Sequence, residues 1–578
     1  MKKRIICLLL ALALMLGICG MLASCGGGPT GEGGGERDEG DFEGDDKNVS
    51  KYYDYTWGTT SLRVEMSDHS SKDLLVSRVK RYLSGEDAGD DRIDELISFR
   101  NGQAENVTRT DIQYKYLQDI PTYGWGSNIS RIARESQSYS ETSADIYVNF
   151  IFDLVAASLQ GAFANLKSVQ MPGSVGVNYF EFMSPGENNE YNAAVDDEGY
   201  MYDLMHSLSF STKKMYVLAS DYFTDVMRSF FSVPVNIAMI NGIDPYMVGE
   251  YNYIDDGKFD IDDFFKIVWN YNWNYEAVKA LSLAVYDPAG ATPDPTVDVN
   301  GFLLGDPDHA VGMLYGTDVE IITRTLNPIT GLYEVEYPEY CESYTNVALA
   351  LSDLFSSTGI GLMPATGSTA TTISSYHIRQ SFISDRCLFG SVVMAGNLEH
   401  TDYQMMNAEG EGGFGVAPVP MYRAFDEAKD VDKNGKNIYY RTAPHNIAKV
   451  AAISVATSKY KQCVAWLDYQ STHSSEILNT YYEDILMYQI AGNNENNILV
   501  LDMLRDNATT ALDKIYDDAI YRVETSPNKN VDARWCRLLR DAKYKLDDVR
   551  VKYSNAVSIK EDALEEIYKK YNSDLLRP

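Results

Sequence analysis

The stretch SADIYVNFIFDLVAASLQG, residues 143–161, is the part of the chain on which the fold assignment depends. Its first half, residues 143–152, is rich in apolar and β-branched side chains and predicts a buried strand. Its second half, residues 153–161, predicts a short helix that ends at Gly161. A strand that leads directly into a helix is typical of α/β proteins, so we expect that class here.

The rest of the chain continues this alternation of short apolar runs and amphipathic stretches. Further strands are predicted at residues 61–66, 214–219, 229–236 and 446–454. Helices are predicted at residues 460–469, 495–506 and within 532–571. No internal repeat is visible. With 578 residues, the chain is too long for one hydrophobic core, so two or more lobes are expected.

The N-terminus has the pattern of a secretory signal. Three cations, Lys2, Lys3 and Arg4, precede the uncharged run IICLLLALALMLGICGML. The run ends in Leu-Ala-Ser-Cys, residues 22–25, which resembles the bacterial lipobox in which the cysteine is acylated. A transmembrane anchor is the alternative, because the run approaches the roughly 20 apolar residues that a span needs. The small residues before Cys25 favour a cleaved signal, residues 1–24, and a lipid-anchored protein at the extracellular face of the cell membrane.

A flexible tether is predicted to follow Cys25. Residues 25–50 consist mainly of Gly, Asp and Glu and cannot bury enough apolar surface to offset the entropy of ordering. The formal net charge of the whole chain is −33, and loss of the signal's three cations makes it more negative. Nucleic acid and anionic lipid surfaces are therefore excluded as general partners. No second long apolar run follows, so the body is expected to be soluble.

Cysteine and acidic patterns give no metal site. Cys341, Cys387, Cys463 and Cys536 lie far apart without zinc-like spacing, which leaves disulfides and buried thiols both open. The run Asp-x-Asp-x-Asn-Gly at residues 430–435 begins like a calcium loop, but its twelfth position is arginine rather than glutamate. Turn chemistry explains the run better, so we predict neither a metal nor another cofactor.

Tyrosine is over-represented, with 42 Tyr against 20 Phe and 6 Trp. A buried tyrosine hydroxyl needs a hydrogen-bond partner, whereas a tyrosine on a surface or in a cleft can stack on a sugar ring and bind its hydroxyls. The excess therefore fits a sugar-binding surface. A general preference for tyrosine on an acidic surface explains it equally well.

Eight short segments, in this order, resemble the bacterial extracellular solute-binding protein family of ABC transporters, in its carbohydrate-binding lipoprotein branch (family 1). They are the Asp-Ile-Tyr strand with its helix to Gly161, residues 215–218, 231–236, 272–276 (Asn-Trp-Asn-Tyr-Glu), 298–302 (Asp-x-Asn-Gly-Phe), 388–389, 414–422 (Phe-Gly-Val-Ala-Pro-Val-Pro-Met-Tyr) and 481–486. Trp273 is interpreted as a structural residue at a helix start. The first 90 mature residues and the C-terminal helices depart from the family pattern.

The resemblance implies an α/β, two-lobed periplasmic-binding-protein-like fold of type II, with a hinge between the lobes and extra C-terminal helices. By analogy, the chain crosses between lobes near Ser220, Asn397 and Thr457. Lobe I would then comprise residues 51–220 and 398–456, and lobe II residues 221–397 and 457–578. A ligand would bind between the lobes, and closure would be the signal that a permease detects.

Candidate ligand-binding residues follow from the predicted strand ends and from that resemblance. Carboxylates accept paired hydroxyl bonds and aromatic faces stack on sugars, which is the chemistry expected at such a site. Helix capping, solvation or packing remains the alternative for each residue. The candidates are Trp125, Asp153, Asp221, Tyr222, Asp306, Asp308 and His309.

The predicted function is capture of a solute by a monomeric protein for delivery to an ABC transporter permease, and the resemblance implies that the solute is a mono- or oligosaccharide. A receptor of the same fold for peptides or another polar solute is one alternative, and a secreted glycan-active enzyme is another. The motifs of zinc proteases, serine hydrolases and P-loop proteins do not occur. We therefore predict no catalytic residues.

Overall fold

The chain divides into two units, residues 1–50 and residues 51–578. A computed structural model describes residues 59–67, 80–85, 92–117, 128–138, 140, 143–168, 199–223, 229–253, 256–305, 312–317, 319–362, 370–394, 396, 398, 401–408, 413–432, 435–444, 448–481, 495–508, 514, 516, 535 and 546–573. The predicted signal, the predicted lipidation site Cys25 and the predicted tether lie outside these residues.

The first sheet defines lobe I. Its strand order is β12-β3-β1-β2, from β12 (Lys449–Ile453), β3 (Ile146–Phe150), β1 (Thr60–Ser67) and β2 (Thr110–Leu117). The first three strands of the chain run parallel, and β12 is antiparallel to β3. Every residue of β3 is buried, as expected for a central strand covered on both faces.

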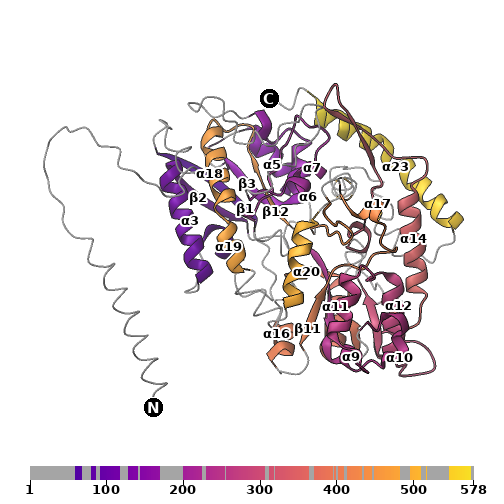
Figure 1. Cartoon of the computed structure of the whole chain (residues 1–578). Coiled ribbons are helices and arrows are strands. Elements are labelled where there is room, and N and C mark those ends of the chain that lie inside the picture. The colour runs from indigo at the N-terminus through magenta and orange to yellow at the C-terminus, as the bar shows by residue number, and fades with distance from the viewer. Residues whose placement is uncertain are drawn as a thin grey trace, which may run out of the picture. The chain divides into compact units, whose positions relative to one another are not determined.

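Helices cover the sheet of lobe I. Directly after β3, α6 begins at Ile151, two residues earlier than predicted. Two late helices, α18 and α19, pack on the early helix α3, so segments more than 350 residues apart in the sequence meet in this lobe (Figure 1). The helices are α3 (Arg92–Thr108), α5 (Asn128–Gln137), α6 (Ile151–Ser158), α7 (Tyr202–Ser207), α18 (Tyr460–Thr472) and α19 (Ser475–Thr480).

The second sheet defines lobe II and repeats the pattern. Its order is β10-β4-β9-β5-β8, and β11 also pairs with β4. Strands β8, β5 and β9 run parallel, and β4 is antiparallel to β9. The strands are β4 (Phe231–Asn236), β5 (Asn300–Leu304), β8 (Ile360–Leu362), β9 (Cys387–Phe389), β10 (Val393–Met394) and β11 (Phe414–Ala417).

Local sequence signals explain several helix starts in lobe II. Asp260 and Asp263 form a capping box at α11, and the Asn274 side chain accepts the backbone N–H groups of Glu276 and Ala277 at α12. Trp273 is fully buried, which confirms its structural role. The helices are α9 (Ile237–Asn241), α10 (Pro245–Val248), α11 (Ile261–Trp269), α12 (Tyr275–Val285), α14 (Glu342–Phe355), α15 (Ala370–Ile383), α16 (Thr401–Ala408), α17 (Glu427–Asp430) and α20 (Glu495–Asp506).

The predicted α/β class with two lobes is confirmed, because each sheet has three parallel strands in the order second, first, third and then an antiparallel strand. Two predicted lobe boundaries are wrong. After residue 397 the chain stays in lobe II, because β11 pairs with β4 along four residues. After Thr457 it stays in lobe I, because α18 and α19 pack on α3. The chain therefore passes from lobe II to lobe I between β11 and β12, and from lobe I to lobe II between α19 and α20.

Two further elements complete the described structure. A hairpin of β6 (Thr323–Asn327) and β7 (Leu332–Glu336) is inserted between β5 and α14. A long helix, α23 (Leu546–Asn572), follows in the C-terminal region, where a helical stretch was predicted. Within the described residues, none of the helices combines the length and apolar composition needed to cross a bilayer.

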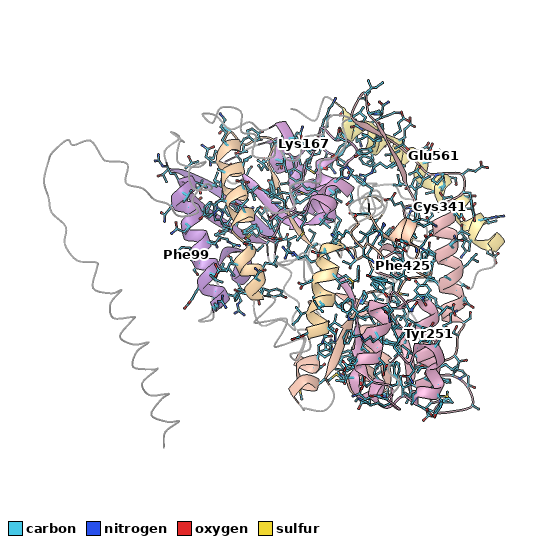
Figure 2. All side chains as sticks on the ribbon, in the orientation of Figure 1. Phe99, Lys167, Tyr251, Cys341, Phe425 and Glu561 are labelled. Atoms are coloured by element: carbon cyan, nitrogen blue, oxygen red, sulfur yellow. The ribbon has the colours of Figure 1, made fainter. Side chains whose placement is uncertain are left out.

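The core corrects the interpretation of tyrosine. Many of the largest fully buried side chains are tyrosines, among them Tyr147, Tyr344 and Tyr439, so much of the excess serves packing rather than a surface. Cys341, Cys387 and Cys463 are free and buried, which favours thiols over disulfides at these three positions (Cys341 is labelled in Figure 2). Cys536 lies outside the described residues.

Candidate functional site

In each sheet the parallel strands end at a common edge, which we call the carboxyl edge. In lobe I, β1, β2 and β3 end at Ser67, Leu117 and Phe150. In lobe II, β5, β8 and β9 end at Leu304, Leu362 and Phe389. Ligands of open α/β sheets bind outside the carboxyl ends of the strands, so these two edges form the candidate site.

The first crossing leaves lobe I at its carboxyl edge. Leu218 pairs antiparallel with Ala451 of β12, which is itself antiparallel to β3. The segment before Ser220 therefore runs in the direction of β3 and ends at the same edge. The chain then enters lobe II as β4, which is antiparallel to β9, so its first residue, Phe231, lies at the carboxyl edge of lobe II.

The second crossing joins the same two edges in the opposite direction. Ala417, the last residue of β11, pairs with Val233 near the start of β4. After the crossing, β12 begins at Lys449, opposite Phe150, the last residue of β3. The two crossings also contact each other, because Pro444 pairs with Phe230 and the Phe231 N–H donates to Thr442 Oγ1 at 3.1 Å. The hinge and both carboxyl edges therefore lie together.

The carboxyl edge of lobe I combines charge with aromatic rings. Asp153 is buried in the first turn of α6, where the positive end of the helix dipole stabilises a carboxylate. The Lys449 amine lies 4.2 Å from the ring centroid of Phe150, which stacks on Phe152 at 5.9 Å. A cation above an aromatic face is attracted by the ring quadrupole. The edge thus presents one acid, one base and two rings.

The carboxyl edge of lobe II contains a strained turn directly after β9. Ser391 is buried and has a φ of 71°, which is uncommon for a residue other than glycine. Beside it, a Cβ at Gly390 would lie 2.8 Å from Phe382 Cδ2 and 2.9 Å from Pro234 Cγ, so only glycine fits there. A positive φ also occurs at Arg109, directly before β2, and at Asp385, just before β9, so the backbone strain is not confined to the carboxyl edges.

Asp221 and Tyr222 occupy the first crossing, but neither is placed as a solute contact. Asp221 Oδ2 accepts from the Arg505 guanidinium of α20 at 3.0 Å, so this carboxylate joins the crossing to lobe II. Burial nevertheless raises the pKa of Asp221 despite the neighbouring arginine. Tyr222 is fully buried between Trp466, at 5.6 Å, and the Arg100 guanidinium, at 4.8 Å. Tyr222 is therefore a core residue, which corrects the sequence interpretation.

The remaining predicted ligand residues lie outside the described residues. Trp125 belongs to the segment that follows β2, and Asp306, Asp308 and His309 belong to the segment that follows β5. Sequence reasoning missed Lys449, Phe150 and Ser391. A lone lysine within the apolar run 446–454 was a signal for Lys449, whereas nothing in the sequence reports the positive φ of Ser391.

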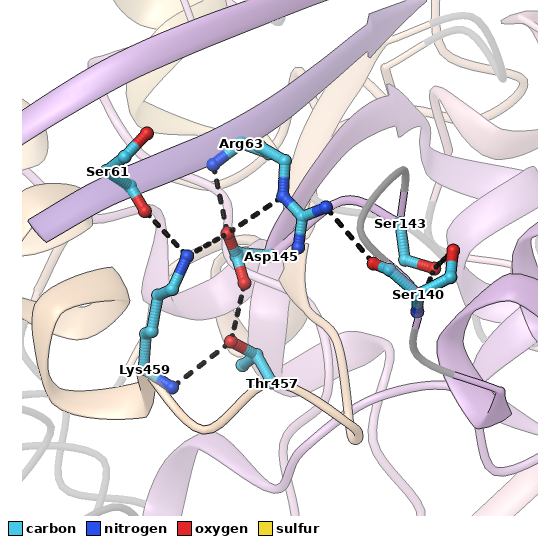
Figure 3. A network of polar contacts seen from close by, with 7 residues as sticks. All are labelled: Ser61, Arg63, Ser140, Ser143, Asp145, Thr457 and Lys459. Carbon is cyan, nitrogen blue, oxygen red and sulfur yellow. Dashed lines mark hydrogen bonds and ion pairs between the residues drawn. The ribbon is translucent and has the colours of Figure 1, made fainter.

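A second polar cluster, the Asp145 network, lies at the opposite end of β3 (Figure 3). Asp145 is fully buried and accepts from Thr457 Oγ1 at 2.7 Å, the Arg63 N–H at 3.0 Å and Lys459 Nζ at 3.2 Å. Lys459 also donates to the Ser61 carbonyl at 2.6 Å. These partners connect β1, the start of β3 and the segment before α18, so the network has a structural role.

Within the described part of the chain, no group of three or more His, Cys, Asp or Glu residues could hold a metal ion. In the run that resembles a calcium loop, both carboxylate oxygens of Asp430 accept from the Arg423 guanidinium at 2.7 Å. Asp432 accepts the Lys436 N–H at 2.7 Å. These contacts are those of an ion pair and a turn.

No family model and no curated protein matches the chain. Among solved structures, it is similar to the lacto-N-biose complex of the galacto-N-biose/lacto-N-biose I-binding protein of a Bifidobacterium longum ABC transporter, with 10% identity, a TM-score of 0.48 and coverage of 88% of this chain and 98% of that one. It is also similar to the sugar-binding protein MalE from Xanthomonas citri, with 8% identity, a TM-score of 0.47 and coverage of 87% of this chain and 99% of that one. A third similar structure is the GacH receptor of Streptomyces glaucescens, with 11% identity, a TM-score of 0.41 and coverage of 87% of this chain and 99% of that one. Because these TM-scores lie below 0.5, the fold assignment depends on the strand order of the chain itself.

Proposed function

We propose that this protein is an extracellular solute-binding protein of type II architecture, which captures a carbohydrate between its two lobes and delivers it to an ABC importer. One observation carries the proposal: the first and second crossing segments both join the carboxyl edges of the two sheets. A rotation about these crossings changes the distance between two edges of the kind that binds ligands. A binding protein that closes on its solute needs this arrangement.

The chemistry of the described edge suits a polar, ring-shaped solute. Asp153 can accept hydroxyl groups, Lys449 can donate to them, and Phe150 and Phe152 supply apolar faces. All four side chains are buried in the present conformation. Access to them would therefore accompany a change in the spacing of the lobes, with the solute shifting the population toward the closed state.

A thermal-shift screen tests the proposed class of solute. The chain from residue 26 onward, which retains every described residue, is heated with mono- and oligosaccharides, amino acids and short peptides. A solute that binds only the native state raises the melting temperature in a concentration-dependent way. We expect oligosaccharides or monosaccharides to do so without turnover, checked by product analysis of each sugar. Stabilisation by peptides alone would move the function to peptide uptake, and turnover of a glycan would refute the transport function.

We also propose that Cys25 carries the lipid that holds the protein at the extracellular face of the membrane. Stable attachment needs more than one acyl chain, which a bacterial lipoprotein supplies. In a bacterial host fed with labelled palmitate, Cys25→Ser should lose both the label and membrane fractionation. The matched control is Cys19→Ser, which changes a cysteine within the signal and should keep both. Retention of label in Cys25→Ser would contradict this assignment.

A further inference from the structure

The β6–β7 hairpin belongs to the chain of lobe II but bonds to the backbone of lobe I. Leu332 pairs with Ser211, the Tyr333 N–H donates to the Phe210 carbonyl at 3.1 Å, and the Thr212 N–H donates to the Gly331 carbonyl at 2.9 Å. The receiving segment precedes Leu218, the residue that bridges to β12 of lobe I. The hairpin therefore connects the lobes at a place separate from the three crossings.

Side chains reinforce this contact. Arg324 Nη1 donates to the His206 and Ser209 carbonyls at 2.9 and 3.0 Å, and its guanidinium lies 4.6 Å from the ring centroid of Tyr333. The Tyr333 hydroxyl lies 2.5 Å from His206 Nε2. Arg324 and Tyr333 come from the hairpin, while His206 and Ser209 come from lobe I. The contact between the hairpin and lobe I, called the junction below, thus contains specific hydrogen bonds as well as packed side chains.

Helix α23 makes a second connection between the lobes. Near its start, the Tyr553 hydroxyl donates to the Pro338 carbonyl at 2.8 Å, and its ring lies 5.8 Å from Tyr344 of α14 in lobe II. At its end, the Tyr571 ring lies 5.3 Å from Phe210 and 5.2 Å from Tyr216 of lobe I. Figure 1 shows α23 running past α14. A continuous helix of 27 residues is about 40 Å long.

We propose that the β6–β7 hairpin and α23 together form an interlobe brace that limits how far the two lobes move about the crossings. Opening by the hinge alone would have to break the backbone bonds of Phe210 and Thr212 or pull Tyr571 from its aromatic neighbours. The brace therefore narrows the range of lobe spacings before any solute binds. The inference relies on the proposed function only for the purpose of that motion, and its test uses no solute, so the two can fail separately.

The test measures the distance between the lobes by pulsed electron–electron double resonance between two nitroxide labels. Nitroxide labels are placed at Phe99→Cys of α3, which is 67% exposed and labelled in Figure 2, and at Tyr246→Cys of α10, which is 92% exposed. Cys341, Cys387 and Cys463 are buried and poorly reactive toward the label, and Cys536→Ser removes the fourth cysteine. The chain begins at residue 26, so that Cys25 is absent while all described residues remain.

Arg324→Met combined with Tyr333→Phe weakens the hairpin junction, and Lys214→Met weakens the α23 end, where Lys214 Nζ donates to the Ser573 carbonyl at 3.1 Å. The matched control is Thr325→Val, an exposed position of the same hairpin. We expect one narrow distance distribution in the unaltered chain and the control. Both brace variants should broaden it and shift it to longer distances, the double variant more strongly. Distributions equal to that of the control, in variants with unchanged circular dichroism, would overturn the proposal.

Hydrogen exchange of the unaltered chain tests the brace without any substitution. The Tyr333 and Thr212 amides donate across the junction, whereas the Leu218 amide donates within the sheet of lobe I. If the brace holds, the first two amides exchange with protection similar to that of the third, because they open only with the folded unit. Fast exchange of Tyr333 and Thr212 beside a protected Leu218 would overturn the proposal even if the variants failed to fold.

Discussion

The two ends of the central strand β3 both carry a buried aspartate, yet the acids have different surroundings. Asp145, at the amino end, is held by Thr457, Lys459 and the backbone of Arg63, which fasten three parts of lobe I together. Asp153, beyond the carboxyl end, lies in the first turn of α6, where β3 and β12 meet the crossing from lobe II. The same residue type thus serves a structural network at one edge and the candidate solute site at the other.

This difference follows from the direction of the strands rather than from the acids themselves. The first two crossings meet lobe I at the carboxyl edge, so a group there can respond to the spacing of the lobes. Among the described residues, the contacts of the Asp145 network that Figure 3 draws at the amino edge come from lobe I, through Ser61, Arg63 and Lys459 directly before α18. We therefore expect stability to depend most on the Asp145 end and solute affinity to depend most on the Asp153 end.

The largest effect is expected from Asp145→Ala. The substitution leaves Lys459 and Arg63 without the carboxylate that they share, and loss of one partner from a buried ion pair costs about 3 kcal/mol or more. The free energy of unfolding, from urea titration, should fall by about that amount. Asp353→Ala, which removes the exposed partner of Lys279, is the control and should cost below about 1 kcal/mol. Equal costs would contradict the structural role of the network.

A smaller effect, on binding rather than stability, is expected from Asp153→Asn. This nearly isosteric change should weaken the affinity for the solute about tenfold, or about 1.4 kcal/mol, because a hydrogen bond to a charged acceptor becomes one to a neutral acceptor. Titration calorimetry measures the affinity. The control is Asp468→Asn, also buried in lobe I, where Asp468 Oδ1 accepts from the Tyr200 hydroxyl at 2.5 Å. An unchanged affinity in Asp153→Asn would remove this residue from the site.

The junction between the lobes adds a third region, where the expected effect depends on pH. Burial, with Arg324 and Lys167 nearby, lowers the pKa of His206 to about 3. The unfolded chain binds this proton near pH 6.5, so His206 destabilises the folded state progressively as pH falls from 6.5 toward 3. The loss is at most about 1.4 kcal/mol per pH unit. His206→Gln should flatten the fall in melting temperature between pH 6.5 and 4.

The exposed His377 of α15 provides the matched control for that measurement. His377→Gln should leave the slope of melting temperature against pH as it is in the unaltered chain. Identical slopes in all three proteins would show that His206 is not held neutral at the junction.

The smallest effect is expected from Tyr222→Phe, which tests the corrected role of a residue that the sequence associated with the ligand. The Tyr222 hydroxyl is buried and has no hydrogen-bond partner among the described residues. Removing a buried polar group without a partner should be neutral or stabilise the protein by up to about 1 kcal/mol, with unchanged affinity. Urea titration and calorimetry measure both. A clear loss of affinity would return Tyr222 to the list of ligand contacts.

Much of the fold was predictable because its signals are local. Short strands flanked by helices predicted the α/β class, and β1, β3, β4, β12 and α20 lie where apolar patterns placed them. The lobe boundaries were not predictable, because the sequences of β11 and α18 would suit a strand or a helix of either lobe. Their membership depends on which strand or helix they contact, namely β4 and α3, each far away along the chain.

The candidate site was predictable only in part. Asp153 was found because it directly follows a buried strand, and strand ends can be located from the sequence. Tyr222 follows a strand too, but its ring packs on Arg100 and Trp466, which lie more than 100 residues away in either direction. Lys449 was overlooked because its position at the carboxyl edge follows from the antiparallel pairing of β12 with β3.

By itself, the sequence determined the chemical character of the chain: the signal-like start, the acidic glycine-rich stretch after it, the strong negative charge and the alternation of strands and helices. These properties depend on composition and on the periodicity of neighbouring residues, which a linear chain already contains. Only the tertiary structure decided which edges meet at the hinge, that tyrosines fill the core, and that the hairpin and α23 reach from lobe II to lobe I. Those features arise from contacts between distant segments, which are selected by the burial and hydrogen bonding of the whole folded unit.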